Sequence, residues 1–156
     1  MPTLVLVRHA KSAYPDGVSD HDRPLNERGE RESQVMAQRL SERFGHVDLA
    51  LVSTARRAQQ TWAPIREVWP DAPHLDRADL YLASASALLS EATALPAAAE
   101  TVAMVGHNPG MEELATELSG VPVTMKTSTF AVLRSDHAWP RWTTASASLV
   151  EVVVAR

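Results

Sequence analysis

Three short apolar runs, separated by helix-like segments, constrain the fold of this chain more than any other feature. They lie at Thr3 to Val7, Leu49 to Val52 and Thr101 to Val105. Continuous apolar runs of this length are typical of strands that are covered on both faces. Because such strands alternate here with helices, the sequence predicts an α/β fold, a three-layer α/β/α sandwich with a mostly parallel central sheet.

Helix signals fill the interval between the first two strands and the segment after the second. Asn26 is a plausible N-cap, and Gly45 suits the end of the helix that it would begin. Ser53 or Thr54 can cap a second helix. Pro64 should kink or end that second helix, because proline removes a backbone donor and crowds the preceding turn.

The second half of the chain continues the same alternation. Ser84 or Ser86 could cap an Ala- and Leu-rich helix that ends before Pro96. Pro109 is well placed as the first residue of a helix that runs to Gly120. Further strands are predicted at three places, a weak one around Leu75 and two late ones at Phe130 to Leu133 and Leu149 to Val153.

Length, charge and cysteine content narrow the class of protein. The chain has 156 residues, which fits a single domain over residues 1–156. A formal net charge of -4 argues against nucleic acid as a partner, because nucleic-acid binders normally carry a basic face. No apolar stretch approaches the length of a membrane span, and no membrane association is expected. With no cysteine and no secretion signal, we expect a cytoplasmic location.

Charged and imidazole side chains follow the three clear strands. Arg8 and His9 come at the end of the first, Arg57 soon after the second and His107 after the third. Parallel strands bring their carboxyl ends to one edge of the sheet, where sites form in such folds. The loop from His9 to Pro24 is also unusually long, and long loops in compact domains are usually functional. We therefore expect these side chains to share one cleft.

Two arginines and two histidines in one cleft suit an anionic ligand. Guanidinium presents a planar set of donors that matches phosphate oxygens. A neutral imidazole can act as a nucleophile, and phosphoryl transfer needs mainly alignment and charge stabilisation. No two histidines lie three or four residues apart, so the sequence offers no helical metal pair. These residues favour phosphoryl chemistry without a metal or another cofactor.

Four short motifs follow one another along the chain. They are Arg8 to Ser12; Asp22 to Leu25 with Arg28 and Gly29; Ser53 to Thr61; and Gly106 to Pro109. Together they resemble the motifs of the histidine phosphatase (phosphoglycerate-mutase-like) superfamily, and the motif around Asp22 to Leu25 is similar to that of small SixA-type phosphohistidine phosphatases within it. The resemblance places the phosphate-clamping arginine at Arg57 and not at its neighbour Arg56.

The resemblance implies roles for individual residues. His9 would be the nucleophile that takes the phosphoryl group, while Arg8, Arg57 and His107 would hold it. Three further residues are candidate phosphate or substrate contacts, and one is a candidate general acid. These are Ser12, Arg23 and Asn108 for the contacts, and Asp79 for the acid.

The substrate is less constrained than the mechanism. The glutamate-containing acid motif of the mutases is absent, and an alkoxide leaves poorly without a general acid. The imidazole of phosphohistidine leaves more easily, and a short chain with compact connections could admit a phosphorylated protein. We therefore expect a phosphohistidine phosphatase acting on proteins. The alternatives are a small-molecule phosphate monoesterase of the same superfamily and a non-catalytic phosphate-binding module.

Overall fold

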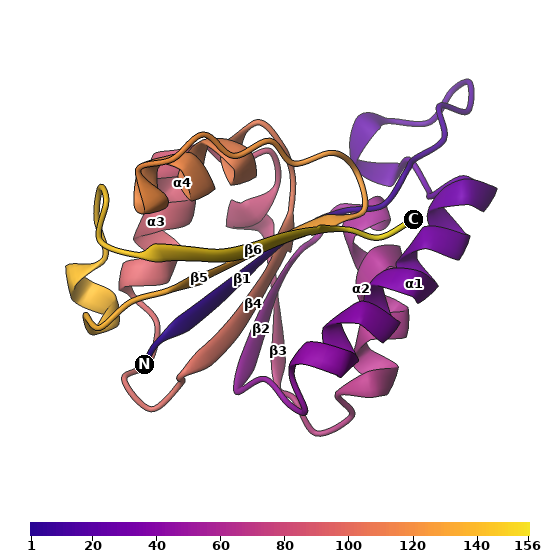
Figure 1. Cartoon of the computed structure of the whole chain (residues 1–156). Coiled ribbons are helices and arrows are strands. Elements are labelled where there is room, and N and C mark those ends of the chain that lie inside the picture. Colours follow the sequence, from indigo (N-terminus) through magenta and orange to yellow (C-terminus); the bar gives the residue numbers. More distant parts are fainter.

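A six-stranded sheet forms the centre of the molecule (Figure 1). The computed structural model describes all 156 residues. The strand order is β3-β2-β4-β1-β5-β6; β1 to β4 run parallel, and β5 is antiparallel to both of its neighbours. The expected mixed α/β fold with a mostly parallel sheet is confirmed. The strands are β1 (Thr3–Arg8), β2 (Leu49–Ser53), β3 (His74–Arg77), β4 (Thr101–Gly106), β5 (Thr129–Arg134) and β6 (Ser148–Val154).

Helices cover both faces of the sheet. In Figure 1, α1 and α2 lie together on one side and α3 and α4 on the other. The α-helices are α1 (Glu27–Arg43), α2 (Arg56–Val68), α3 (Ala85–Thr93) and α4 (Gly110–Ser119). Three short 3-10 turns complete the fold, namely η1 (Asp20–Asp22), η2 (Ala78–Leu80) and η3 (Trp139–Arg141).

Two of the predicted helix caps are confirmed by hydrogen bonds. The side chain of Asn26 accepts the backbone N–H of Gly29 at 2.8 Å, at the start of α1. Ser84, rather than Ser86, accepts the N–H of Ala87 at 3.2 Å and begins α3. Both side chains satisfy a donor that the first turn of a helix leaves free.

The expected cap of α2 was wrong, and Pro64 does not end the helix. Ala55, and not Ser53 or Thr54, occupies the N-cap position, and no side chain caps the helix. Pro64 lies inside the helix, which continues to Val68. Pro64 and its neighbour Ile65 are both buried, and this burial stabilises the segment despite the backbone donor that proline removes.

The helix after β4 begins one residue later than predicted. Pro109 occupies the N-cap position, and α4 starts at Gly110. An added Cβ at Gly110 would lie 2.0 Å from the carbonyl oxygen of Ala83, so glycine allows α4 to approach this neighbouring segment. Gly120 ends the helix in the left-handed region, at φ 74°.

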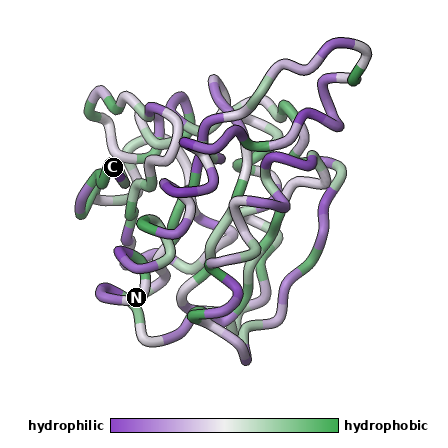
Figure 2. Tube along the Cα trace, turned by 90° about the vertical axis from the view of Figure 1, so that its right-hand side faces the viewer, coloured by the Kyte–Doolittle hydropathy of each residue, from purple (hydrophilic) through white to green (hydrophobic).

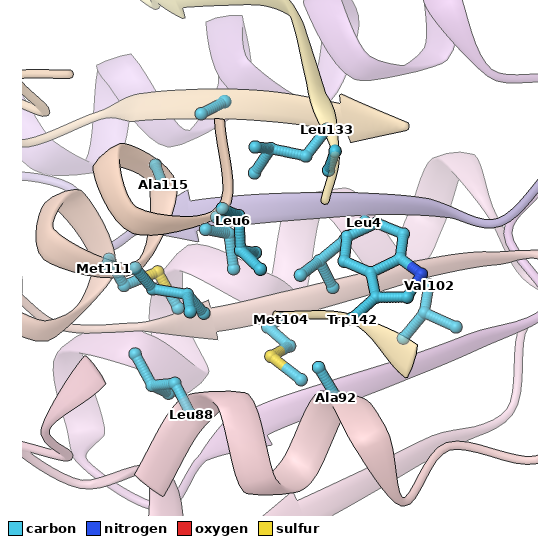
Figure 3. Packing of buried hydrophobic residues seen from close by; sticks show 14 of the residues in the cluster. Leu4, Leu6, Leu88, Ala92, Val102, Met104, Met111, Ala115, Leu133 and Trp142 are labelled. Carbon is cyan, nitrogen blue, oxygen red and sulfur yellow. The ribbon is translucent and has the colours of Figure 1, made fainter. Parts of the chain in front are cut away.

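Each face of the sheet buries its own hydrophobic core. Leu4 and Leu6 of β1 point towards α3 and α4, whereas Val5 and Val7 point towards α1 and α2. Figure 3 shows the first core, where Met104 lies among side chains from the helices and from the late segment that carries Trp142. The parallel pairing of β1 with β4 places Arg8, the last residue of β1, and His9 after it at the carboxyl end of the sheet. No helix in the structure is both long enough and apolar enough to cross a membrane.

The loop between β1 and α1 is tied to the first turn of α1. It projects at the top of Figures 1 and 2, and Figure 2 also shows the hydropathy of the whole trace. The carbonyl oxygen of Lys11 accepts the N–H of Asn26 at 3.0 Å. A Cβ added at Gly29 would lie 2.0 Å from that same oxygen. Glycine at this position therefore allows α1 to lie against the segment that follows the first strand.

We expect Gly29→Ala to lower the free energy of unfolding by about 2 kcal/mol, because a backbone clash of this kind forces the loop or the helix to shift. The clash should outweigh the roughly 1 kcal/mol that alanine gains over glycine in a helix. Urea denaturation of Gly29→Ala and of the control Gly45→Ala, where a Cβ meets nothing within 4 Å, would measure the difference. Equal stability of the two variants would contradict the close approach.

Candidate active site

The ends of three neighbouring strands form one pocket. Arg8 is the last residue of β1 and His9 follows it. Arg57 lies in the first turn of α2 after β2, and His107 follows β4. The structure brings these four residues together around a cavity of about 230 Å³. Its lining consists of Arg8, His9, Lys11, Ser12, Tyr14, Asp20, Arg23, Arg57, Leu82, His107, Asn108 and Thr127.

His9 is held with one ring nitrogen ready to react. Its Nδ1–H donates to the carbonyl oxygen of Ala10 at 2.7 Å, which leaves the lone pair of the neutral ring on Nε2. The side chain is nearly enclosed, with 7% of the residue exposed. Burial, followed by the charges of Arg57 and Arg8, lowers the pKa of His9 to about 4. At neutral pH the ring therefore keeps its lone pair.

Arg57 lies directly against that nitrogen. Its Nε–H points to His9 Nε2 at 3.3 Å, and only 2% of the residue is exposed. Thr61, one turn further along α2, accepts the backbone N–H of Ala10 at 3.0 Å and donates to the Arg57 carbonyl oxygen at 2.7 Å. The Thr61 hydroxyl therefore links α2, which carries Arg57, to the segment after β1, which carries His9.

One ring nitrogen of His107 has no hydrogen-bond partner. Its other ring nitrogen, Nε2, lies 2.7 Å from Ser53 Oγ, and that oxygen accepts the backbone N–H of Ala55 at 3.3 Å. We assign the Ser53 hydroxyl as the donor to His107 Nε2, which places the proton of the neutral ring on Nδ1. His107 Nδ1 is buried and has no partner. The ring centroids of His107 and His9 are 5.2 Å apart.

Burial also keeps His107 neutral. Loss of hydration, followed by the nearby His9 and Arg57, lowers the pKa of His107 to about 3. The neutral ring can donate one hydrogen bond from Nδ1 without adding a further positive charge beside Arg8 and Arg57. His107 is therefore suited to binding an anion's oxygen as a donor rather than as a cation.

Arg8 and Asn108 both contact the segment around Met125, with different consequences. One terminal nitrogen of Arg8 donates to the Met125 carbonyl oxygen at 2.8 Å, while its buried Nε has no partner. The Asn108 amide donates both of its hydrogens, to Met125 O at 2.7 Å and to Glu112 Oε2 at 3.0 Å. Asn108 lines the pocket, but both hydrogens of its side-chain amide are used, so this amide has none left for a phosphate oxygen.

The predicted residues Ser12 and Arg23 lie together on the lining. A terminal nitrogen of Arg23 donates to Ser12 Oγ at 2.9 Å, and its side chain is only 12% exposed. Burial of this kind sets Arg23 apart from an ordinary surface arginine. It adds a third guanidinium to those of Arg8 and Arg57 in the same pocket.

Asp79 does not line the pocket. Its side chain is 76% exposed and pairs with Arg77 at 3.4 Å. The η2 turn that contains it directs Tyr81, two residues later, towards the pocket residues instead, where its ring lies edge-on to His107 at 5.5 Å. The geometry gives no support to the candidate general acid.

Sequence reasoning missed Asp20, which lines the pocket, and Tyr81, which contacts Asp20 and His107. Asp20 accepts from Arg57 through its backbone oxygen at 2.7 Å and through Oδ2 at 3.1 Å, and Tyr81 donates its hydroxyl to the same carboxylate. The Tyr81 hydrogen bond, with help from Arg57 and Arg23, lowers the pKa of Asp20 to about 2. Asp16 and Asp22 share the same loop, and nothing in the sequence distinguishes Asp20 from them.

The lowered pKa values predict a pH titration. In phosphate-free buffer, the imidazole NMR signals of His9 and His107 should stay in their neutral positions as the pH falls from about 8 to about 5. They should move only as the pH approaches about 4 for His9 and about 3 for His107, since burial penalises the charged ring. His9→Gln and His107→Gln would assign the signals. Titration of either ring near its ordinary pKa of about 6.5 would contradict the assigned burial.

Comparisons with known proteins agree on a family. The family model described as the histidine phosphatase superfamily (branch 1) matches residues 4–80. An uncharacterized protein of Mycobacterium tuberculosis is 37% identical over 161 residues, which cover 96% of this chain and 100% of the relative.

Two solved structures share the fold over nearly their whole length. A candidate phosphohistidine phosphatase SixA from Nakamurella multipartitia is 34% identical, with a TM-score of 0.86 over 97% of this chain and 95% of its own. A second candidate SixA, from Agrobacterium tumefaciens, is 29% identical, with a TM-score of 0.83 over 98% of each chain.

Proposed function

Because this chain belongs to the histidine phosphatase superfamily and is a phosphatase, we propose that it carries the phosphoryl group on His9 and acts, without a metal, on phosphohistidine in proteins. One observation supports the assignment of the site most directly. Two buried nitrogens without a partner, Arg8 Nε and His107 Nδ1, belong to residues that line the same pocket as His9. Buried polar atoms are rarely left unpaired, and an oxyanion would satisfy both.

The proposed reaction has two displacements at phosphorus. In the first, the His9 Nε2 lone pair forms the N–P bond while the bond from phosphorus to the substrate nitrogen breaks, and the departing imidazole takes up a proton from solvent water. The Ala10 carbonyl oxygen, which accepts from Nδ1–H, stabilises the positive charge that develops on the ring. In the second, water attacks phosphorus as the His9 N–P bond breaks. Inorganic phosphate leaves with both protons of that water, and His9 returns to its neutral form.

Positive groups around His9 would stabilise the transferring phosphoryl group. Arg57 already contacts Nε2, the atom that would carry phosphorus, and Arg8 and His107 offer the two unused donors. Their role is to bind the equatorial oxygens, on which charge concentrates during transfer. The guanidiniums of Arg8 and Arg57 would also align the phosphoryl group with the imidazole of His9.

The preference for phosphohistidine follows from the absence of a suitable acid on the lining. Asp20 is the only carboxylic acid among the lining residues, and with a pKa of about 2 it is ionised at neutral pH. It therefore cannot supply the proton that an alkoxide leaving group needs. An imidazole leaving group needs less assistance. A cavity of about 230 Å³ accommodates a phosphoryl group and part of the side chain that bears it.

A comparison of specificity constants tests this proposal. We expect kcat/KM for a phosphohistidine-bearing protein to exceed that for sugar phosphates and nucleotides by at least about 100-fold, or about 3 kcal/mol in transition-state binding. Activity should be unchanged by a chelator. A preference for alkyl phosphates would support a small-molecule phosphatase instead, and phosphate binding without any turnover would support a binding module. Complete loss with the chelator would refute the metal-free mechanism.

A further inference from the structure

An aspartate of the chain itself already occupies the cationic side of the pocket. Oδ1 of Asp20 accepts from Arg23 Nε at 3.0 Å, and Oδ2 accepts from a terminal nitrogen of Arg57 at 3.1 Å and from the Tyr81 hydroxyl. The Asp20 backbone oxygen accepts from the other terminal nitrogen of Arg57 at 2.7 Å. Two of the three pocket guanidiniums are thus bound to an internal anion.

These contacts use the donors that a phosphate would need. Guanidinium has five N–H bonds. In Arg57, Nε–H points to His9 and each terminal nitrogen gives one hydrogen to Asp20. A phosphate bound to the remaining two hydrogens would lie beside the Asp20 carboxylate, and the two negative charges would repel each other.

The position of Asp20 allows its carboxylate to break its contacts with Arg57 and Arg23 and to form them again. It lies in the short η1 turn, within the loop that projects at the top of Figure 1. Its side chain is 49% exposed, whereas that of Arg57 is 3% exposed. The carboxylate can therefore exchange protein contacts for water without opening the core, while the guanidinium stays in place.

We propose that Asp20 competes with inorganic phosphate for Arg57 and Arg23, and so promotes release of the product. This inference rests on the proposed function, because it takes the pocket to be the phosphoryl site. A pocket with three guanidiniums would otherwise hold the product tightly. The Tyr81 hydroxyl supports the competing position by donating to the carboxylate.

Asp20→Asn tests the competition, because it removes the charge while the single amide oxygen can still accept a hydrogen bond from one of the two arginines. Calorimetry with inorganic phosphate, and with tungstate as a second oxyanion, would give dissociation constants. We expect Asp20→Asn to bind phosphate about tenfold more tightly than the wild type, a difference of roughly 1.4 kcal/mol. Phosphate should also inhibit its turnover at correspondingly lower concentration.

Asp22→Asn is the matched control from the same turn. The Asp22 carboxylate accepts a hydrogen bond from Ser19 and does not line the pocket. The phosphate affinity of Asp22→Asn should therefore stay within about twofold of that of the wild type. Tyr81→Phe gives an independent variant should Asp20→Asn fold poorly. It removes one hydrogen bond from the competing carboxylate and should tighten phosphate binding in the same direction, by less.

The outcomes separate this inference from the proposed function. Equal or weaker phosphate binding by both Asp20→Asn and Tyr81→Phe would overturn the competition and leave Asp20 as a residue that only positions Arg57. A wild-type protein that binds neither phosphate nor tungstate would instead refute the assignment of the pocket. Tighter binding by Asp22→Asn to the same degree would also overturn the inference, because the effect would then reflect net charge alone.

Discussion

Replacement of Arg57 by alanine should lower kcat/KM by at least about 10³-fold, the scale of losses seen when a guanidinium that stabilises a transferring phosphoryl group is removed. The residue is 2% exposed and contacts His9 Nε2. No other guanidinium in the structure donates to that nitrogen, so the loss should appear mainly in kcat. Arg57→Lys should restore little, because an ammonium lacks the planar set of donors that reaches His9 and the phosphoryl oxygens together.

Arg56 supplies the control for this experiment. It precedes Arg57 in the same first turn of α2, carries the same charge and is exposed. Arg56→Ala should keep kcat/KM within about twofold of the wild type, since isolated surface charges contribute little. Steady-state kinetics on both variants, with folding checked by circular dichroism, would measure the difference. Equal losses in Arg56→Ala and Arg57→Ala would contradict the assigned clamp.

His9→Ala should abolish turnover, with a loss of at least about 10⁴-fold, because no other imidazole can take the place of the proposed nucleophile. His107 is the nearest other imidazole, but its Nε2 is bound to Ser53 and the proton of its neutral ring lies on Nδ1. The variant should still bind inorganic phosphate through its arginines, which shows that the pocket remains folded. His46→Ala, at an exposed position, is the control and should keep full activity.

A residual activity within tenfold of the wild type in His9→Ala would contradict the mechanism. Such a result would mean that water attacks the substrate directly and that the pocket only binds and polarises it. Loss of phosphate binding together with activity would show that the variant had lost its pocket. In that case His9→Gln, which preserves more of the side-chain volume, would repeat the comparison.

The sequence was sufficient to predict the sheet and the place of the site. Apolar runs specify strands because burial on both faces leaves few alternatives, and β1, β2 and β4 follow those runs closely. Parallel strands then place their carboxyl ends at one edge by topology alone. For this reason Arg8, Arg57 and His107 could be expected to meet His9 although they are far apart in the chain.

The contacts made by the loops could not be predicted in this way. Asp20 reaches Arg57 only because of the path of an irregular loop, and its sequence neighbours Asp16 and Asp22 have the same chemistry. Asp79 was a candidate acid from its region of the sequence, yet its side chain pairs with Arg77, while Tyr81 two residues later lies against His107. Side-chain direction within a turn depends on packing with distant elements, which a local pattern does not contain.

Ser53 shows how one residue can satisfy two patterns at once. As a serine before a helix it suggests an N-cap, but it is also the last residue of β2, where its hydroxyl lies 2.7 Å from His107 Nε2. Tertiary contact with the imidazole takes precedence over local capping, and Ala55 is left at the N-cap position. Ser53 does lie just before the helix, but its hydroxyl contacts His107, which lies 54 positions away in the sequence, instead of capping the helix.

Rapid mixing with a ³²P-labelled phosphohistidine substrate, followed by an alkaline quench and peptide mapping, tests the central proposal most directly. We expect a label that is stable in base and labile in acid, located on the peptide that contains His9 and absent from His9→Ala. A label on any other residue, or full turnover with no label on the wild-type protein at any mixing time, would contradict a phosphoryl group carried by His9.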